Sequence, residues 1–197
     1  MEAFKQLSSK MMPVPINDID TDQIIPALYL KVTSKDGLVE GLFSNWRYLP
    51  GTKTDNPEFA INKPEHQGAT ILVGGDNFGT GSSREHAPWA LMGYGFKAII
   101  STSFADIFRS NSLKNGLLPV IVDEETHKQI FSLIEEDPET AVTIDLESQT
   151  LTLPDGRSVE FPIDAFSKKC MRDGVDQLGY LLQMNDKIEA FEAANGK

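Results

Sequence analysis

The chain has 197 residues, of which 40% are hydrophobic and 24% are charged, which suits a single domain spanning residues 1–197. The chain has 29 acidic and 18 basic residues, and its formal net charge of −11 disfavours nucleic acid and anionic membranes as partners. The sequence has neither a run of about 20 apolar residues nor an apolar signal-peptide core, so we expect a cytoplasmic protein.

Cysteine and histidine are scarce: the chain has one cysteine, Cys170, and the three histidines His66, His86 and His127. One thiol cannot form an internal disulfide, and an iron–sulfur cluster needs three or four thiolates. The histidines are far apart and show no metal-ligand spacing. We therefore expect no metal and no cofactor on this chain, and we interpret Cys170 as a buried apolar residue.

The first third of the chain has little regular pattern. Residues 12–26 are rich in turn formers, and the apolar pair Ile24–Ile25 is stopped by Pro26. Residues 27–68 contain several glycines and prolines and are typical of long loops with one short helix. A loop-rich region of this length in a compact domain is usually functional or mobile.

From residue 69 onward, short β-branched apolar runs alternate with segments of helical periodicity. The strands are expected at residues 69–73, 97–101 and 117–122, and the helices at about 86–93, 103–115 and 124–136. This alternation predicts an α/β fold with a central, mostly parallel sheet flanked by helices.

The last third is expected to add a β-hairpin, one more strand and a broken helix. These elements are predicted at residues 141–146 and 150–153, at residues 158–162, and at residues 164–192 with interruptions at Gly174 and Gly179.

A glycine-rich segment, residues 74–86, connects a predicted strand to a predicted helix. Its glycines permit a tight turn and a close approach of the backbone to a ligand. Ser82 and Glu85 fit a capping box, which would place the free amides of a helix start near Ser82 and Ser83. With the guanidinium of Arg84 beside them, these amides predict a site for an anion such as a carboxylate.

The same segment allows less specific interpretations. A serine before a helix is more often a simple cap than a catalyst. The nucleotide phosphate loop needs a lysine that is absent here, and the dinucleotide fingerprint lacks its third glycine. The residues alone therefore leave open a reactive Ser82, a capping Ser82, and a non-catalytic anion-binding module.

Three ordered motifs add a family resemblance. The sequence GTGSSREH at residues 79–86 resembles the signature of the swivelling domain of the aconitase superfamily, and residues 104–119 resemble the next block of that family. The sequence DTDQIIP at residues 20–26 is similar to the opening motif of isopropylmalate dehydratase small subunits. The resemblance implies a swivelling β/β/α domain of the aconitase C-terminal type.

The resemblance also implies roles for individual residues. Ser82 matches the serine that acts as the general base, Arg84 matches a residue that binds a substrate carboxylate, and Ser83 assists in substrate binding. Asp22 matches an acidic position that organises or binds substrate. For Asp22, together with Asp20, a role limited to capping a turn stays equally open.

The loop after Pro26 supplies an apolar patch that includes Leu28 and Leu30. Such a patch predicts a pocket for an isopropyl group of the substrate. The alternative is that both leucines only anchor the loop to the core.

By resemblance, the chain is one subunit of a hydro-lyase of leucine biosynthesis. The implied reaction converts 2-isopropylmalate, a small dicarboxylate, to 3-isopropylmalate through isopropylmaleate. The family's [4Fe–4S] cluster is then expected on a separate large subunit, in a heterodimer or heterotetramer. A related hydratase of the methylmalate, citraconate or homoaconitate type is the alternative within the superfamily.

Overall fold

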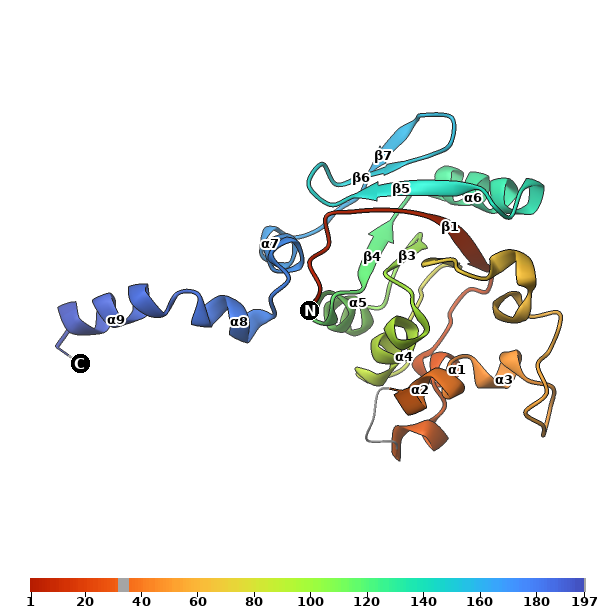
Figure 1. Ribbon diagram of the computed structural model, residues 1–197, viewed down its shortest axis with the longest axis horizontal. Coiled ribbons are helices and arrows are strands. Elements are labelled where there is room, and N and C mark those ends of the chain that lie inside the picture. Colours follow the sequence, from red (N-terminus) through yellow and green to blue (C-terminus); the bar gives the residue numbers. More distant parts are fainter. Residues whose placement is uncertain (32–35, 197) are drawn as a thin grey trace.

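The computed structural model describes residues 1–31 and 36–196. Within these residues, seven strands form one sheet in the order β4-β3-β2-β1-β5-β6-β7 (Figure 1). The strands are β1 (Gln6–Val14), β2 (Ile71–Gly74), β3 (Ala98–Ser101), β4 (Leu118–Ile121), β5 (Ala141–Asp145), β6 (Thr150–Thr152) and β7 (Ser158–Glu160).

The sheet has two halves that meet at β1. Strands β1 to β4 run parallel to their neighbours, whereas β1 pairs with β5 antiparallel and the sheet continues antiparallel to β7. The predicted α/β fold with flanking helices is confirmed, but the sheet is mixed rather than mostly parallel, because the hairpin strands β5 to β7 extend it in antiparallel pairing. The strands expected after residue 69 and the later hairpin lie where the apolar runs predicted them.

Strand β1 was absent from the sequence-based prediction, although it is central in the sheet. Its first half, with Ser8, Ser9 and Lys10, is polar and partly exposed, and Pro13 interrupts the apolar end. The two buried methionines, Met11 and Met12, point to opposite faces. A strand buried on one half and solvated on the other has no clean period, so the pattern did not reveal it.

Helices cover both faces of the sheet (Figure 1). The α-helices are α1 (Thr21–Ile24), α2 (Asp36–Gly41), α3 (Ser44–Arg47), α4 (His86–Tyr94), α5 (Asp106–Asn115), α6 (Glu124–Glu136), α7 (Ala165–Asp173), α8 (Gln177–Leu182) and α9 (Asn185–Ala194). The described part of region 27–68 also contains three 3₁₀ turns, Ala27–Lys31, Ala60–Asn62 and Pro64–His66. This region holds more short helices than the single one expected, and its residues 32–35 lie outside the described residues.

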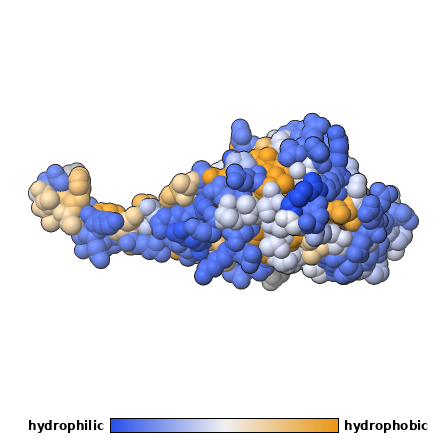
Figure 2. Space-filling model, turned by 90° about the horizontal axis from the view of Figure 1, so that it is seen from above, coloured by the Kyte–Doolittle hydropathy of each residue, from blue (hydrophilic) through white to orange (hydrophobic). Residues whose placement is uncertain are grey.

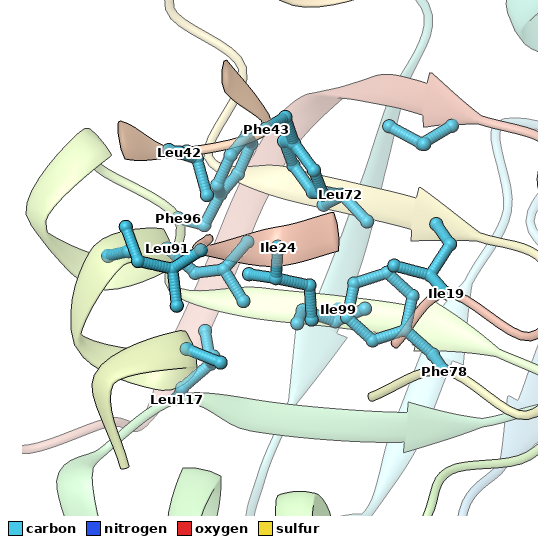
Figure 3. Packing of buried hydrophobic residues seen from close by; sticks show 14 of the residues in the cluster. Ile19, Ile24, Leu42, Phe43, Leu72, Phe78, Leu91, Phe96, Ile99 and Leu117 are labelled. Carbon is cyan, nitrogen blue, oxygen red and sulfur yellow. The ribbon is translucent and has the colours of Figure 1, made fainter. Parts of the chain in front are cut away.

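Two hydrophobic clusters, one on each face, make up the core. Apolar residues of α1, α2 and α4 belong to the first cluster, and those of α6 and α7 belong to the second. In Figure 3, Ile24 of α1 points toward Ile99 of β3, and Phe78 lies beside Ile19. The loop after β1 is thus fixed to the sheet by buried side chains, which holds the segments described below in place.

The C-terminal helices form an arm that projects from the body (Figures 1 and 2). The predicted break at Gly174 is confirmed, because this glycine caps α7 with a φ of 70°. The predicted break at Gly179 is wrong: Gly179 lies inside α8, and the next break follows Leu182. Neither α8 nor α9 contains a buried residue. None of the described helices combines the length and apolar character that crossing a membrane requires.

Candidate active site

The segment that follows β1 runs beside the glycine-rich turn that follows β2. The backbone N–H of Gly79 donates to the carbonyl of Ile19 at 2.7 Å, and the N–H of Thr21 donates to the carbonyl of Thr80 at 2.8 Å. Asp20 and Thr80 form a parallel β-bridge. Because β1 and β2 are parallel neighbours, their carboxyl ends deliver both motifs to the same edge of the sheet.

Helix α1 begins with a complete capping box. The Asp20 side chain accepts a hydrogen bond from the N–H of Gln23 at 2.7 Å, and the Gln23 side chain accepts one from the N–H of Asp20 at 2.9 Å. Of Asp20 and Asp22, for which a capping role was left open, Asp20 caps the start of α1. Asp22, two residues later in the first turn, is left to make a different contact.

Gly79 and Phe78 fix the course of the turn. Phe78 is fully buried and packs edge-on against Phe108 with ring centroids 5.4 Å apart. Gly79 has a φ of 81°, and a Cβ atom there would lie 2.1 Å from Cγ of Phe108. Glycine is required at this position by both the backbone conformation and the contact.

The hydroxyl of Ser82 lies 2.9 Å from the hydroxyl of Thr21, and either oxygen can donate. Ser82 is half-buried, whereas Ser83 is exposed. The carbonyl of Ser83 accepts a hydrogen bond from the Asn111 side chain at 3.1 Å, which ties the turn to α5. The first serine is therefore held by the opening motif and the second by a helix.

Arg84 forms an ion pair and hydrogen bond with Asp22. This hydrogen bond holds the pKa of the Asp22 carboxyl below its usual value; burial opposes the lowering, and the charge of Arg84 and the N–H of Ala27 add to it. The Arg84 side chain is 25% exposed and the Asp22 side chain 55% exposed. A guanidinium has five N–H donors, so Arg84 can hold Asp22 and still bind a carboxylate of a ligand.

The predicted capping box of Ser82 and Glu85 is wrong. Helix α4 begins at His86, its N-cap is Glu85 in helical conformation, and no side chain caps it. The start of α4 agrees with the helix expected at about residues 86–93. The Ser82 hydroxyl is bonded to Thr21 instead, so the amides of a helix start do not surround Ser82 as predicted.

The two leucines after Pro26 differ in surroundings. Leu28 is 75% exposed and lines a hollow of about 440 Å³ with Tyr48 and Leu49. Leu30 is half-buried and packs against the first core cluster. The structure thus places Leu28 at an open apolar surface, whereas Leu30 anchors the loop.

The structure brings Ser82, Arg84 and Asp22 together, and their chemical roles stay predictions. Sequence reasoning missed Thr21, whose position between two aspartates of the opening motif was its only signal. It also did not predict the contact of Asn111, which lies in α5 and supports Ser83.

The residues of this chain do not fit an iron–sulfur cluster. Its one cysteine, Cys170, is buried, and burial raises the pKa of its thiol. Among residues 1–31 and 36–196, no three His, Cys, Asp or Glu side chains are grouped in a way that could hold a metal ion.

Comparisons with known proteins cover nearly the whole chain. A family model described as Aconitase C-terminal domain matches residues 1–125, and one described as LeuD_N matches residues 128–165. The fold is similar to the crystal structure of 3-isopropylmalate dehydratase (leuD) from Methanocaldococcus jannaschii, with a TM-score of 0.67 and 25% identity, over 95% of this chain and 99% of that chain. These matches confirm the expected swivelling domain of the aconitase C-terminal type.

Curated relatives are more similar still. The 3-isopropylmalate dehydratase small subunit of Roseiflexus sp. (strain RS-1) is 62% identical over 98% of this chain and 95% of the relative. The protein of the same name from Chloroflexus aurantiacus is 57% identical over 99% of this chain and 96% of the relative. In both comparisons the similarity extends over at least 95% of each chain. The chain belongs to the family of 3-isopropylmalate dehydratase small subunits.

Proposed function

We propose that the chain acts in leucine biosynthesis as the small subunit of a hydro-lyase that interconverts 2-isopropylmalate and 3-isopropylmalate. One observation supports the proposal: Ser82, Arg84 and Asp22 lie together at one edge of the sheet. They do so in a chain that is similar over 98% of its length to a 3-isopropylmalate dehydratase small subunit. The cytoplasm is its proposed compartment.

Ser82 is the proposed general base. As an alkoxide, its Oγ takes the proton from the carbon next to a substrate carboxylate. The electron pair of that C–H bond forms the C=C bond of isopropylmaleate, and the hydroxyl on the neighbouring carbon takes up a second proton and leaves as water. That second proton is released again when water adds to the double bond. In the rehydration step the proton held by Ser82 returns to the other carbon, so the isomerisation consumes no acid or base.

Arg84 is the proposed carboxylate ligand. Its side chain is anchored by Asp22 and faces partly to solvent, so its free N–H groups are available for a planar carboxylate. Asp22 orients the guanidinium rather than contacting substrate by itself, since an anion beside a dicarboxylate would be repelled. Ser83, exposed next to the base, assists through its hydroxyl.

The apolar side group of the substrate is proposed to contact Leu28. Leu28 is the exposed leucine of the loop, whereas Leu30 packs against the core. One methylene in such a pocket changes the binding energy by about 1–3 kcal/mol, so the contact favours isopropyl over smaller groups only moderately.

A large partner subunit is proposed to complete the site. A [4Fe–4S] cluster, which supplies Lewis-acid chemistry in this superfamily, needs three or four thiolates, whereas this chain has one cysteine, so we assign the cluster to that subunit. The expected complex is a heterodimer or heterotetramer in which Ser82 faces the partner.

The test is turnover of 2-isopropylmalate by the chain combined with a cluster-bearing large subunit, against each chain alone. We expect turnover only from the combination, and Ser82→Ala should reduce it by more than about 1000-fold. Ser132→Ala, an exposed hydroxyl on α6, is the matched control and should keep full activity. An active Ser82→Ala complex would contradict the role of Ser82 as the base. A preference for methylmalate or homoaconitate over isopropylmalate would contradict the proposed substrate.

A further inference from the structure

The hydroxyl of Thr21 directly contacts Ser82, the proposed base. Thr21 is 1% exposed, and its Oγ1 lies 2.9 Å from Oγ of Ser82. Buried hydroxyls are normally satisfied by backbone or by fixed side chains. Here the partner is a side chain of the candidate site, on a segment that is remote in the sequence.

The backbone of Thr21 is fixed at both ends. Its N–H donates to the carbonyl of Thr80 at 2.8 Å, and its carbonyl accepts from the N–H of Ile25 at 2.9 Å. Thr21 is also the first helical residue after the capping box of Asp20. A β-branched side chain on such a backbone has few rotamers, so its hydroxyl is held in place before substrate arrives.

An ionised serine at position 82 needs hydrogen-bond donors. The start of α4 lies four residues further on, at His86, and the nearby cation of Arg84 is paired with Asp22. The Thr21 hydroxyl adds a neutral donor within hydrogen-bond distance of the Ser82 oxygen. A fixed donor aimed at a developing or resting negative charge, away from bulk water, is an effective way to stabilise it.

We propose that Thr21 is a positioning residue for Ser82: its hydroxyl donates to Ser82 Oγ, holds that oxygen toward the substrate and stabilises its ionised form. The inference rests on the proposed function. When Ser82 takes the substrate proton it becomes a neutral hydroxyl, and the hydrogen bond to Thr21 persists with either oxygen as donor.

Four substitutions in the reconstituted complex test the role of the hydroxyl. Thr21→Val keeps the shape and removes the hydroxyl, Thr21→Ser keeps the hydroxyl and removes the methyl, and Thr21→Ala removes both. Thr126→Val is the matched control, because it breaks a 2.9 Å hydroxyl-to-oxygen hydrogen bond at Asp123, outside the candidate site.

We expect Thr21→Val to lower kcat about 10- to 100-fold with KM changed less than about 3-fold. The acidic limb of its pH–rate profile should move to higher pH, because the alkoxide is less stable without the donor. Thr21→Ser should recover most of the rate, and Thr126→Val should leave kcat and the pH profile unchanged. Melting temperatures of all variants separate these effects from loss of folding.

Two outcomes would overturn the proposal. One is a Thr21→Val complex with the wild-type kcat and pH profile. The other is equal loss in Thr21→Ser and Thr21→Ala, which differ only by the hydroxyl; this pair decides the question even where Thr21→Val does not fold. Failure of the proposed function is recognised separately, since the wild-type complex would then not turn over isopropylmalate or Ser82→Ala would stay active.

Discussion

Arg84 of the glycine-rich turn is bound to Asp22 of the opening motif, although the two residues are 62 positions apart in the chain. This side-chain pair connects the two motifs at a place where backbone hydrogen bonds of Ile19 and Thr21 already connect them. The guanidinium is therefore oriented by the protein itself before any ligand binds, which lowers the cost of ordering it on binding.

The first prediction concerns the shape of the cation. Arg84→Lys keeps the charge but loses the planar fork that can hold Asp22 and a substrate carboxylate together. We expect KM for isopropylmalate to rise about 10- to 100-fold, as for the loss of a charge-assisted hydrogen bond of about 1.5–3 kcal/mol. Steady-state kinetics of the complex measure this. Arg157→Lys, which alters a surface pair with Asp155, is the control and should leave KM unchanged.

The second prediction concerns pH and Asp22. Its pKa is lowered in the folded chain, so the carboxylate stabilises the fold above its unfolded value of 3.8, and this contribution is lost as pH falls through the lower folded value. Since the side chain is half exposed, the pair contributes at most about 1 kcal/mol. Urea unfolding should show Asp22→Asn slightly less stable than wild type at pH 7 and equal to it near pH 2. A difference that persists at the low pH would contradict the ion-pair origin.

The third prediction separates backbone strain from crowding at the turn. Gly79 and Gly68 share a φ of 81°, but a Cβ at Gly68 would meet nothing within 4 Å, whereas at Gly79 it would overlap Phe108. Gly68→Ala should cost roughly 1–2 kcal/mol, from the left-handed backbone alone. Gly79→Ala should cost about 1–3 kcal/mol more. Chemical denaturation measures the free energy of unfolding of both variants. Equal losses of stability would show that Phe108 moves aside at little cost.

The fourth prediction concerns the C-terminal arm. Because α9 buries no residue, deleting residues 183–197 should change the melting temperature by less than about 2 °C while reducing the helical signal in circular dichroism. Deletion from residue 165 is the contrasting variant. It removes Met171, fully buried in the second cluster, and should destabilise the chain strongly. A large loss from the shorter deletion would mean that the arm packs on the body in solution.

Much of the fold could be predicted where the local pattern is strong. Strand β3 is a continuous apolar run buried on both faces, and α6 has a clear amphipathic period, so both were predicted within a residue or two. The short helices between residues 27 and 68 could not be predicted, because they depend on tertiary contacts such as that of Gly41 with Tyr29. That the chain is a single domain stays a prediction.

The candidate site was predictable in its residue types but not in its contacts. Arg84 and Ser82 stood out as anion-binding and reactive groups next to glycines. Their partners Asp22 and Thr21 lie in the short helix α1, which follows the strand β1 that was not predicted, so no sequence spacing could reveal the pairing. The capping box was predicted at the wrong helix, because the spacing of Ser82 and Glu85 matched as well as that of Asp20 and Gln23.

The central position of β1 has a consequence for how the chain folds during synthesis. Its two neighbours, β2 and β5, begin only at residues 71 and 141, so β1 is synthesised before either of them and waits with both edges unpaired. Long-range pairing of this kind slows folding and exposes the strand to other chains. Ser8, Ser9 and Lys10, the polar residues that obscured the strand, make this nascent segment a poor template for aggregation.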